Sequence, residues 1–187
     1  MGLILNAAIF LLEAVSLYMC FKARKLANFV YYTQLSNMLC GLSCLLYVLF
    51  GPLSWVTEIR YLAACAVTMT FLVTTCVLIP MGGSAEKLLL RGNGPFHHVL
   101  CPLLCVISYI FFEAHAGADM IAASMGITFL YGIIMLILNC MRKVDGPYPF
   151  FRVYNQPVYA SVFWVIALTA LIGVISWAVF SAAGLVL

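Results

Sequence analysis

Charge is the scarcest property of this 187-residue chain: 8% of its residues are charged, whereas 66% are hydrophobic. An ordinary soluble domain has about 25% charged and about 45 to 50% apolar residues. Water does not tolerate so much exposed apolar surface, so the composition excludes a soluble single domain. The net charge of +3 is small and the basic residues are dispersed, which argues against a nucleic-acid partner. The composition predicts an integral membrane protein surrounded by the bilayer.

The chain also lacks the cysteine spacing that is typical of a disulfide scaffold or a zinc site. Its eight cysteines lie inside or at the ends of apolar runs, where we expect them to be small packing residues. The N-terminal segment lacks a basic leader and carries Glu13, so we expect the first membrane span there rather than a removable signal peptide. We expect neither a cofactor nor a metal ion.

Six apolar runs are each long enough to cross a bilayer, which takes about 20 helical residues. They leave only short connections, so no room remains for a separate soluble domain. The predicted fold class is therefore all-α, a polytopic six-helix transmembrane bundle that forms a single domain over residues 1–187. The spans are expected at residues 3–21, 28–50, 59–81, 95–112, 121–141 and 157–185.

The basic residues indicate how this bundle is oriented. Eight of the nine fall in the first, third and fifth connections, and Arg60 in the second is the exception. The positive-inside rule places those three connections in the cytoplasm and both termini on the non-cytoplasmic side. The eight residues are Lys22, Arg24, Lys25, Lys87, Arg91, Arg142, Lys143 and Arg152.

Polar side chains form a stripe along the second apolar run. Such side chains are costly in a bilayer, so they normally face a bundle interior and are candidate functional residues. Small polar residues also let two helices pack closely, which is the simplest explanation of the stripe. Four polar residues within five positions, 33 to 37, exceed what packing alone requires. At helical steps of three and four residues, the stripe comprises Thr33, Ser36, Asn37, Cys40, Gly41 and Cys44.

Two adjacent histidines, His97 and His98, begin the fourth span just after Pro95. Adjacent helical side chains point about 100° apart, so at most one of them can face a given partner, and a metal site on the pair is disfavoured. A histidine near the end of a span is most simply an interfacial or packing residue. At a rise of about 1.5 Å per residue, however, His98 and Thr33 both lie roughly 6 to 9 Å inside the same membrane face.

The same level holds further polar residues, Asn139 near the end of the fifth span and Tyr154 and Asn155 before the sixth. A threonine hydroxyl is a poor nucleophile until a base removes its proton, and a neutral imidazole suits that work. A Thr33–His98 pair is therefore sufficient for acyl transfer. Amide or hydroxyl groups would orient the imidazole or stabilise an oxyanion. The candidates for that supporting role are Asn37, Ser36, Gln34 and Asn139.

Other polar groups in the spans have simpler explanations. The third span contains Thr68, Thr70, Thr74 and Thr75, but no base lies near them along the chain, so helix packing is the simpler interpretation. Glu13 lies near the middle of the first span. A proton relay, an orienting group and an uncharged packing group are three open alternatives for it.

The segment at residues 145–152 combines turn-forming and aromatic residues at the predicted cytoplasmic face. Anchoring in the headgroup region is the plain interpretation of the aromatic side chains. The functional alternative is a lid that covers the polar cluster and receives a lipid tail. The residues that we assign to this substrate or lid role are Tyr148, Phe150, Tyr154 and Asn155.

Four motifs follow one another through most of the chain. They lie at residues 32–37 (YTQLSN), at 68–71 with 78–80, at 98–102 (HVLCP) and at 148–150 (YPF). In this order and spacing they resemble the androgen-induced gene family of membrane hydrolases, together with bacterial six-span membrane proteins of mostly unassigned function. The phrasing of the motifs is the bacterial one, so the resemblance implies the bacterial plasma membrane.

The resemblance also implies an activity. The animal members are intramembrane hydrolases that use a threonine nucleophile and a histidine on fatty acid esters of hydroxy fatty acids, so a lipid or fatty-acyl ester is the implied substrate. Thr33 matches the threonine. His98 matches the histidine of the bacterial relatives, four residues before Pro102. Some animal members place it five residues before the proline, at His97, and the asparagine that precedes it there has only Asn93 as a counterpart.

Two functions from other classes stay open. A proton-coupled transporter, or a membrane protein that binds a lipid or small molecule without catalysis, would use the polar cluster for its solute and the histidines as proton relays. The absence of a detectable inverted repeat gives this function less support. A scaffold protein would use the same side chains only to join helices, so Thr33→Val would cost stability and nothing else. The sequence makes no prediction of the oligomeric state.

Overall fold

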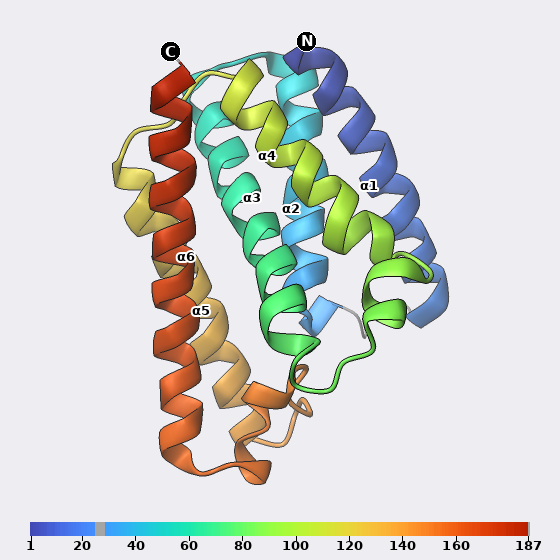
Figure 1. Cartoon of the computed structure of the whole chain (residues 1–187), viewed down its shortest axis with the longest axis vertical. Helices are drawn as coiled ribbons and strands as arrows, with labels where there is room; N and C mark the ends of the chain where they lie inside the picture. Colours follow the sequence, from blue (N-terminus) through green and yellow to red (C-terminus); the bar gives the residue numbers. More distant parts are fainter. Residues whose placement is uncertain (25–28, 187) are drawn as a thin grey trace.

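The computed structural model describes residues 1–24 and 29–186, and over these residues the chain is helical and contains no strand (Figure 1). Five helices are long and apolar enough to cross a membrane, which makes the chain an integral membrane protein. The predicted start of the second span at residue 28 lies outside the described residues, as does Lys25. The five helices are α1 (Gly2–Arg24), α2 (Tyr32–Phe50), α3 (Ser54–Val73, continued by a π-helical turn at Thr74–Leu78), α5 (Asp119–Cys140) and α6 (Val158–Val186).

The remaining predicted span, residues 95–112, forms a shorter apolar helix. It consists of a π-helical turn, Phe96–Leu100, followed by α4 (Cys101–Phe112), and together they make 17 residues. At about 1.5 Å per residue such a helix rises about 25 Å, less than the hydrocarbon core of about 30 Å. Of the six predicted spans, five therefore form helices of full spanning length.

Helix α3 begins at Ser54, whereas the predicted span begins at residue 59. Ser54 and Glu58 are polar, so the hydropathy pattern leaves them out, but the helix continues through them and their side chains bond each other at 3.3 Å. An apolar run marks the part of a helix that suits hydrocarbon, and the helix itself extends beyond that part.

Helix α3 occupies the centre of the bundle. It packs against α2, α4, α5 and α6, while α1 packs against α2 and α4 (Figure 1). The consecutive α3 residues Ala63, Ala64 and Cys65 are all fully buried. Since consecutive residues point about 100° apart, neighbours must cover this helix on every side. Both chain ends lie at one end of the bundle, and the turns after α3 and α5 lie at the other (Figure 1).

The polar stripe of α2 faces the bundle interior, as its spacing predicts. At Gly41 an added Cβ would lie 3.2 Å from the Cβ of Glu13, so α1 and α2 approach closely here and a larger residue would require Glu13 to shift by a few tenths of an ångström. This close approach brings Glu13 against the stripe. The stripe residues Thr33, Ser36, Asn37, Cys40, Gly41 and Cys44 are all buried.

Arg60, expected in the second connection, lies within α3 and is fully buried. Its guanidinium donates to both carboxylate oxygens of Glu113 at 2.8 Å, and Ser108 and Asn6 donate to the same carboxylate at 2.7 and 2.9 Å. Burial acts to raise the pKa of Glu113, but Arg60 and these hydrogen bonds outweigh it and hold the pKa below its usual value. The ionised pair joins α3 to the end of α4, and Asn6 adds α1.

Candidate functional site

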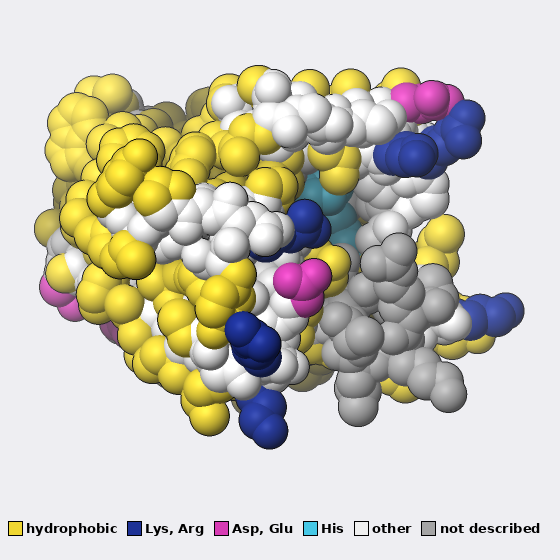
Figure 2. Space-filling view, turned by 90° about the horizontal axis from the view of Figure 1, so that it is seen from below, with side chains coloured by type: hydrophobic (Ala, Val, Ile, Leu, Met, Phe, Trp, Pro, Cys, Tyr) yellow, Lys and Arg dark blue, Asp and Glu magenta, His cyan; other side chains and the backbone are white. Residues whose placement is uncertain are grey.

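Two adjoining cavities lie toward the end of the bundle opposite the chain termini. The larger one, which we call the entrance cavity, has a volume of about 680 Å³. The start of α2, the turns on either side of residues 84–91 and residues 147–149 line it. Figure 2 looks at this end, where Lys and Arg side chains, together with an acidic one, lie near a hollow in which histidine is visible. The connections here carry the basic residues Lys87, Arg91, Arg142, Lys143 and Arg152.

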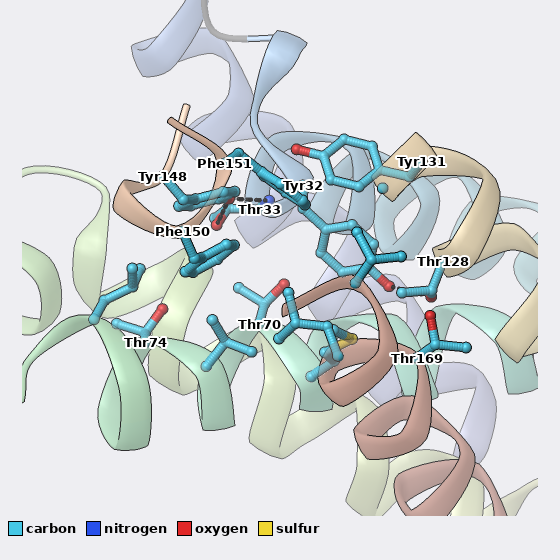
Figure 3. Close-up of a pocket in the computed structure, with 16 residues that line it drawn as sticks. Tyr32, Thr33, Thr70, Thr74, Thr128, Tyr131, Tyr148, Phe150, Phe151 and Thr169 are labelled. Atoms are coloured by element: carbon cyan, nitrogen blue, oxygen red, sulfur yellow. Dashed lines mark hydrogen bonds between the residues drawn. The ribbon is translucent and has the colours of Figure 1, made fainter. Parts of the chain in front are cut away.

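The second space, which we call the slot, runs between α2, α3, α5 and α6 (Figure 3). Its volume is about 30 Å³, which is room for about one water molecule. Tyr148 and Phe150 lie at one end of it, and Thr128 and Thr169 lie at the other (Figure 3). Half of its sixteen lining residues are apolar and half carry a hydroxyl group, so the walls suit an apolar ligand that also bears polar groups. The slot residues that carry hydroxyl groups are Tyr32, Thr33, Thr70, Thr74, Thr128, Tyr131, Tyr148 and Thr169.

Thr33 lines both spaces, so it lies where they meet. It is the second residue of α2, and N–H groups in the first turn of a helix lack an acceptor within the helix. Its N–H donates instead to the Tyr148 hydroxyl at 3.2 Å, and that hydroxyl also bonds Thr33 Oγ1 at 3.2 Å (Figure 3). Burial raises the pKa of the Tyr148 phenol, although its hydrogen bonds with Thr33 act against the rise. The phenol therefore keeps a proton that it can donate.

Ser36 and Asn37 support the backbone of Thr33 rather than its hydroxyl. The Ser36 hydroxyl and the Asn37 amide donate to the Thr33 carbonyl oxygen at 3.0 and 2.7 Å. Ser36 Oγ also bonds Thr70 Oγ1 of α3 at 2.8 Å. These bonds fix the first turn of α2 against α3, so Ser36 and Asn37 hold the Thr33 backbone in place.

His98 lies in the π-helical turn before α4, and its side chain lines the entrance cavity. Its Nδ1 lies 2.9 Å from Thr74 Oγ1, at the start of the π-helical turn that ends α3. His98 and Thr33 thus share one cavity, but each is hydrogen-bonded to a different hydroxyl. Among the bonds of the described residues, none joins Thr33 directly to His98.

His97 turns away from the entrance cavity and is fully buried. Its Nε2 lies 3.4 Å from Glu13 Oε2, and its Nδ1 lies 3.0 Å from Asn93 Nδ2 and 3.3 Å from Gln34 Nε2. In the described part of the chain, His97 Nε2 and both carboxylate oxygens of Glu13 lack a well-formed hydrogen bond. The predicted supporting residue Gln34 therefore orients His97, and Glu13 faces an imidazole.

Phe150 extends the contact between the connection after α5 and the slot. Its ring stacks on that of Tyr148 with centroids 5.1 Å apart and 16° between the ring planes. Both rings line the slot, and Tyr148 also lines the entrance cavity. Tyr148 therefore lies where the two spaces meet, and Phe150 packs against it on the slot side.

The other predicted residues of this region line neither cavity. Asn139 donates to the Val144 carbonyl oxygen at 2.9 Å and accepts from the Val153 N–H at 3.0 Å, so it holds the connection after α5 in shape. Tyr154 and Asn155 are exposed on the surface. The structure thus places these three residues apart from Thr33 and His98.

Thr74 is the site residue that sequence reasoning missed. Because no base lies near it along the chain, the sequence favours helix packing for its hydroxyl. Antiparallel neighbours, however, bring the end of the third span and the start of the fourth to one membrane face. Thr74 lies near that face as well, so depth along the two helices predicts that it can meet His98.

The site is defined by its own geometry, since comparison with protein-family models, curated proteins and solved structures finds no match to this chain. Among the described residues, no group of three or more His, Cys, Asp or Glu side chains is placed to hold a metal ion. The groups that converge on the entrance cavity are a hydroxyl, an imidazole, a phenol and a helix N-terminus. These groups suit acyl transfer.

Proposed function

We propose that this chain is an intramembrane threonine hydrolase that cleaves a lipid ester, such as a fatty acid ester of a hydroxy fatty acid. Thr33 is the nucleophile and His98 the general base. The observation that carries the proposal is the place of Thr33 at the junction of the slot and the entrance cavity, with His98 on the wall of that cavity. A direct bond between the two is not required before substrate binds, because catalytic hydrogen bonds are often loose in free enzymes.

The first chemical step is acylation. Thr33 Oγ1 attacks the ester carbonyl carbon while the hydroxyl proton passes to Nε2 of His98, and the carbonyl oxygen becomes an oxyanion. The Thr33 N–H and the Tyr148 hydroxyl, which bond each other at 3.2 Å, are the two donors at hand for that oxyanion. The N-terminus of α2 adds a favourable partial positive charge.

Collapse of this intermediate completes the reaction in two stages. The carbonyl re-forms, the bond to the alcohol oxygen breaks, and His98 gives its proton to the leaving alcohol, which leaves an acyl-Thr33 ester. A water molecule then attacks that ester while His98 takes a proton from the water. The bond between the acyl carbon and Thr33 Oγ1 breaks, Oγ1 receives the proton from His98, and the carboxylic acid is released.

The two spaces divide the substrate between them. The acyl chain enters the slot and the alcohol portion stays in the entrance cavity, so the scissile carbonyl lies beside Thr33. Because the slot is narrow without substrate, the Tyr148 and Phe150 rings must shift as the chain enters, as a lid does.

The membrane arrangement belongs to the same proposal. The chain crosses the bacterial plasma membrane six times with both termini outside, so α4 and its preceding turn form the shortest span. The basic side chains around the entrance cavity support a cytoplasmic location for that end. A lipid of the cytoplasmic leaflet is therefore the substrate class that reaches the site.

Mapping the covalent adduct of a long-chain alkyl fluorophosphonate tests the proposed function. The purified protein in lipid nanodiscs is treated with the probe, digested, and analysed by mass spectrometry. We expect the phosphonate on Thr33, because this hydroxyl is the activated nucleophile. An adduct on Thr74 would contradict the assignment, and the absence of an adduct would contradict the hydrolase itself.

Gly132 gives a test of the acyl slot. It lies on α5 and lines the slot, and an added Cβ there would lie 3.8 Å from both Cγ atoms of Val165. The Cβ of a new side chain therefore fits at this position, but the rest of the leucine side chain in Gly132→Leu extends into the slot and fills it. We expect kcat/KM for a palmitoyl ester to fall at least about tenfold while that for an acetyl ester stays unchanged.

Gly126 supplies the matched control for the slot, since it lies on the same helix and an added Cβ there meets nothing within 4 Å. Gly126→Leu should leave both esters unaffected. Equal losses for the palmitoyl and acetyl esters in Gly132→Leu would show that the slot does not hold the acyl chain.

The buried Glu13–His97 pair favours a second candidate function, proton-coupled transport. The Glu13 carboxylate lies 3.4 Å from the His97 imidazole, and the Gln34 amide separates that imidazole from the open entrance cavity. This arrangement suits a proton relay. Uptake into proteoliposomes driven by a pH gradient, together with an unlabelled Thr33, would favour transport over hydrolysis.

A further inference from the structure

The strongest polar contact of His98 is with Thr74, a residue that the proposed reaction does not use. Thr74 is 1% exposed and lines the slot, whereas His98 lines the entrance cavity. The 2.9 Å bond between Thr74 Oγ1 and His98 Nδ1 therefore crosses the wall between the two spaces. Thr74 itself does not line the entrance cavity.

This contact bears on which nitrogen of His98 carries the proton. A neutral imidazole has one N–H and one lone pair, and a base needs the lone pair toward the hydroxyl that it activates. With Nδ1 bonded to Thr74, Nε2 is the nitrogen left for the entrance cavity. An Nδ1–H that donates to Thr74 Oγ1 would leave the Nε2 lone pair free to accept the proton of Thr33.

We propose that Thr74 is the positioning residue of the site: its hydroxyl oxygen accepts a hydrogen bond from Nδ1–H of His98 and so holds the imidazole in the tautomer that acts as a base. This inference rests on the proposed function of Thr33 and His98. Thr74 forms no bond to the substrate and gains or loses no proton. The same hydrogen bond stabilises the imidazolium that forms when His98 accepts a proton.

The local backbone explains how the two side chains come to face each other. Thr74 begins a π-helical turn in which the N–H of Ile79 donates to its carbonyl oxygen at 3.1 Å, and His98 lies in the π-helical turn before α4. A π-helical turn inserts an extra residue, which rotates the side chains that follow, and such turns are frequent at functional sites. Each helix thus departs from regular geometry where it meets the other.

Pro102 contributes to the turn that carries His98. It has no N–H, so it cannot donate to the carbonyl groups of the preceding turn. The side-chain amide of Asn37 donates to the His97 carbonyl oxygen at 3.3 Å and replaces one lost bond. Asn37 therefore links the first turn of α2, which carries Thr33, to the turn that carries His98.

The experiment compares Thr74→Val, which keeps the shape but removes the hydroxyl, with Thr74→Ser, which restores it. We expect Thr74→Val to slow fluorophosphonate labelling of Thr33 by about tenfold or more. The loss is smaller than the ~10⁴-fold one that follows neutralisation of an orienting carboxylate, because a hydroxyl holds an imidazole less strongly. Thr74→Ser should recover most of the rate.

The tautomer itself is measured by ¹⁵N NMR of histidine-labelled protein at alkaline pH, with His98→Gln used to assign the signals. We expect a protonated Nδ1 and an unprotonated Nε2 in His98 of the wild type, and a shift toward Nε2–H in Thr74→Val. A change in packing alone would not move the proton between the nitrogens. A wild-type ring protonated at Nε2 would overturn the inference.

Thr75→Val is the matched control, because the Thr75 hydroxyl donates to carbonyl oxygens of its own helix at 2.8 and 3.3 Å. It should label at the wild-type rate. Undiminished labelling in Thr74→Val would overturn the role of Thr74, provided that Thr33→Ala abolishes labelling. If Thr33→Ala labels normally, the proposed function fails instead, and the NMR result alone decides whether Thr74 sets the tautomer.

Discussion

Thr33→Ala is expected to lower ester hydrolysis at least about 10³-fold and to abolish fluorophosphonate labelling, because the proposed acyl-enzyme forms on the Thr33 hydroxyl. The variant removes the hydroxyl but keeps the helical N–H that bonds Tyr148 at 3.2 Å. Substrate binding in the slot should therefore survive, so kcat falls while KM changes little. Steady-state kinetics with a fluorogenic palmitoyl ester in nanodiscs measures both.

Thr33→Val and Thr33→Ser separate chemistry from packing. Valine keeps the branched shape and should be as inactive as alanine, with a loss of about 0.5 to 1.5 kcal/mol in stability from the missing bond to Tyr148. Serine keeps the hydroxyl and should retain measurable activity. A scaffold function requires instead that Thr33→Val affect stability alone. Equal labelling of this variant and the wild type would therefore show that Thr33 serves only in helix packing.

Thr68→Val is the matched control on a neighbouring helix. The Thr68 hydroxyl donates to the Ala64 carbonyl oxygen of α3 at 2.7 Å, and the residue lines neither cavity. It should hydrolyse the ester at the wild-type rate. An equal loss of activity in Thr68→Val and Thr33→Val would show that the losses come from disturbed packing.

Hydrophobic patterning accounts for much of this fold because each helix must satisfy the bilayer by itself. The apolar runs predict where the helices lie, and the period of the α2 stripe predicts which face is buried. The depths of Thr33 and His98 along their helices predict that they lie at the same level, and in the structure both line one cavity. These features depend on one helix at a time, which is why a single sequence carries them.

Contacts that depend on the rotation of a helix could not be predicted in the same way. The π-helical turn at residues 96–100 decides that His97 meets Glu13 and His98 meets Thr74, and a regular helix would give other partners. The positive-inside pattern placed Arg60 in a connection, because charge counting does not reveal a carboxylate partner 53 residues away. Pairings between helices require the packed bundle.

The buried Arg60–Glu113 pair should therefore dominate the stability of the end that carries the chain termini. Arg60→Met leaves the buried Glu113 carboxyl without its counter-charge, and Glu113→Leu leaves an unpaired guanidinium that is fully buried. Breaking a buried pair from either side is expected to cost about 3 to 5 kcal/mol in the free energy of unfolding. Unfolding in mixed micelles with increasing SDS measures this loss.

The double variant Arg60→Met/Glu113→Leu gives the sharper result, because replacement of both charges by apolar side chains is often neutral or stabilising. We expect it to recover most of the stability that each single variant loses. Such recovery identifies the uncompensated charge as the cause. A double variant as unstable as the sum of the two single variants would mean that the pair itself holds α3 and α4 together.

The exposed pair Arg91–Glu86 is the control for charge without burial. Its 2.6 Å contact is shorter than that of the buried pair, but the two side chains are 68% and 60% exposed. Arg91→Met should change the free energy of unfolding by less than about 1 kcal/mol, because water and salt screen a surface pair.

Since Arg60 lies at the other end of the bundle from the entrance cavity, its variants should keep wild-type activity for each folded molecule. A loss of activity at unchanged stability would mean that the pair acts on the cavity and not on the fold.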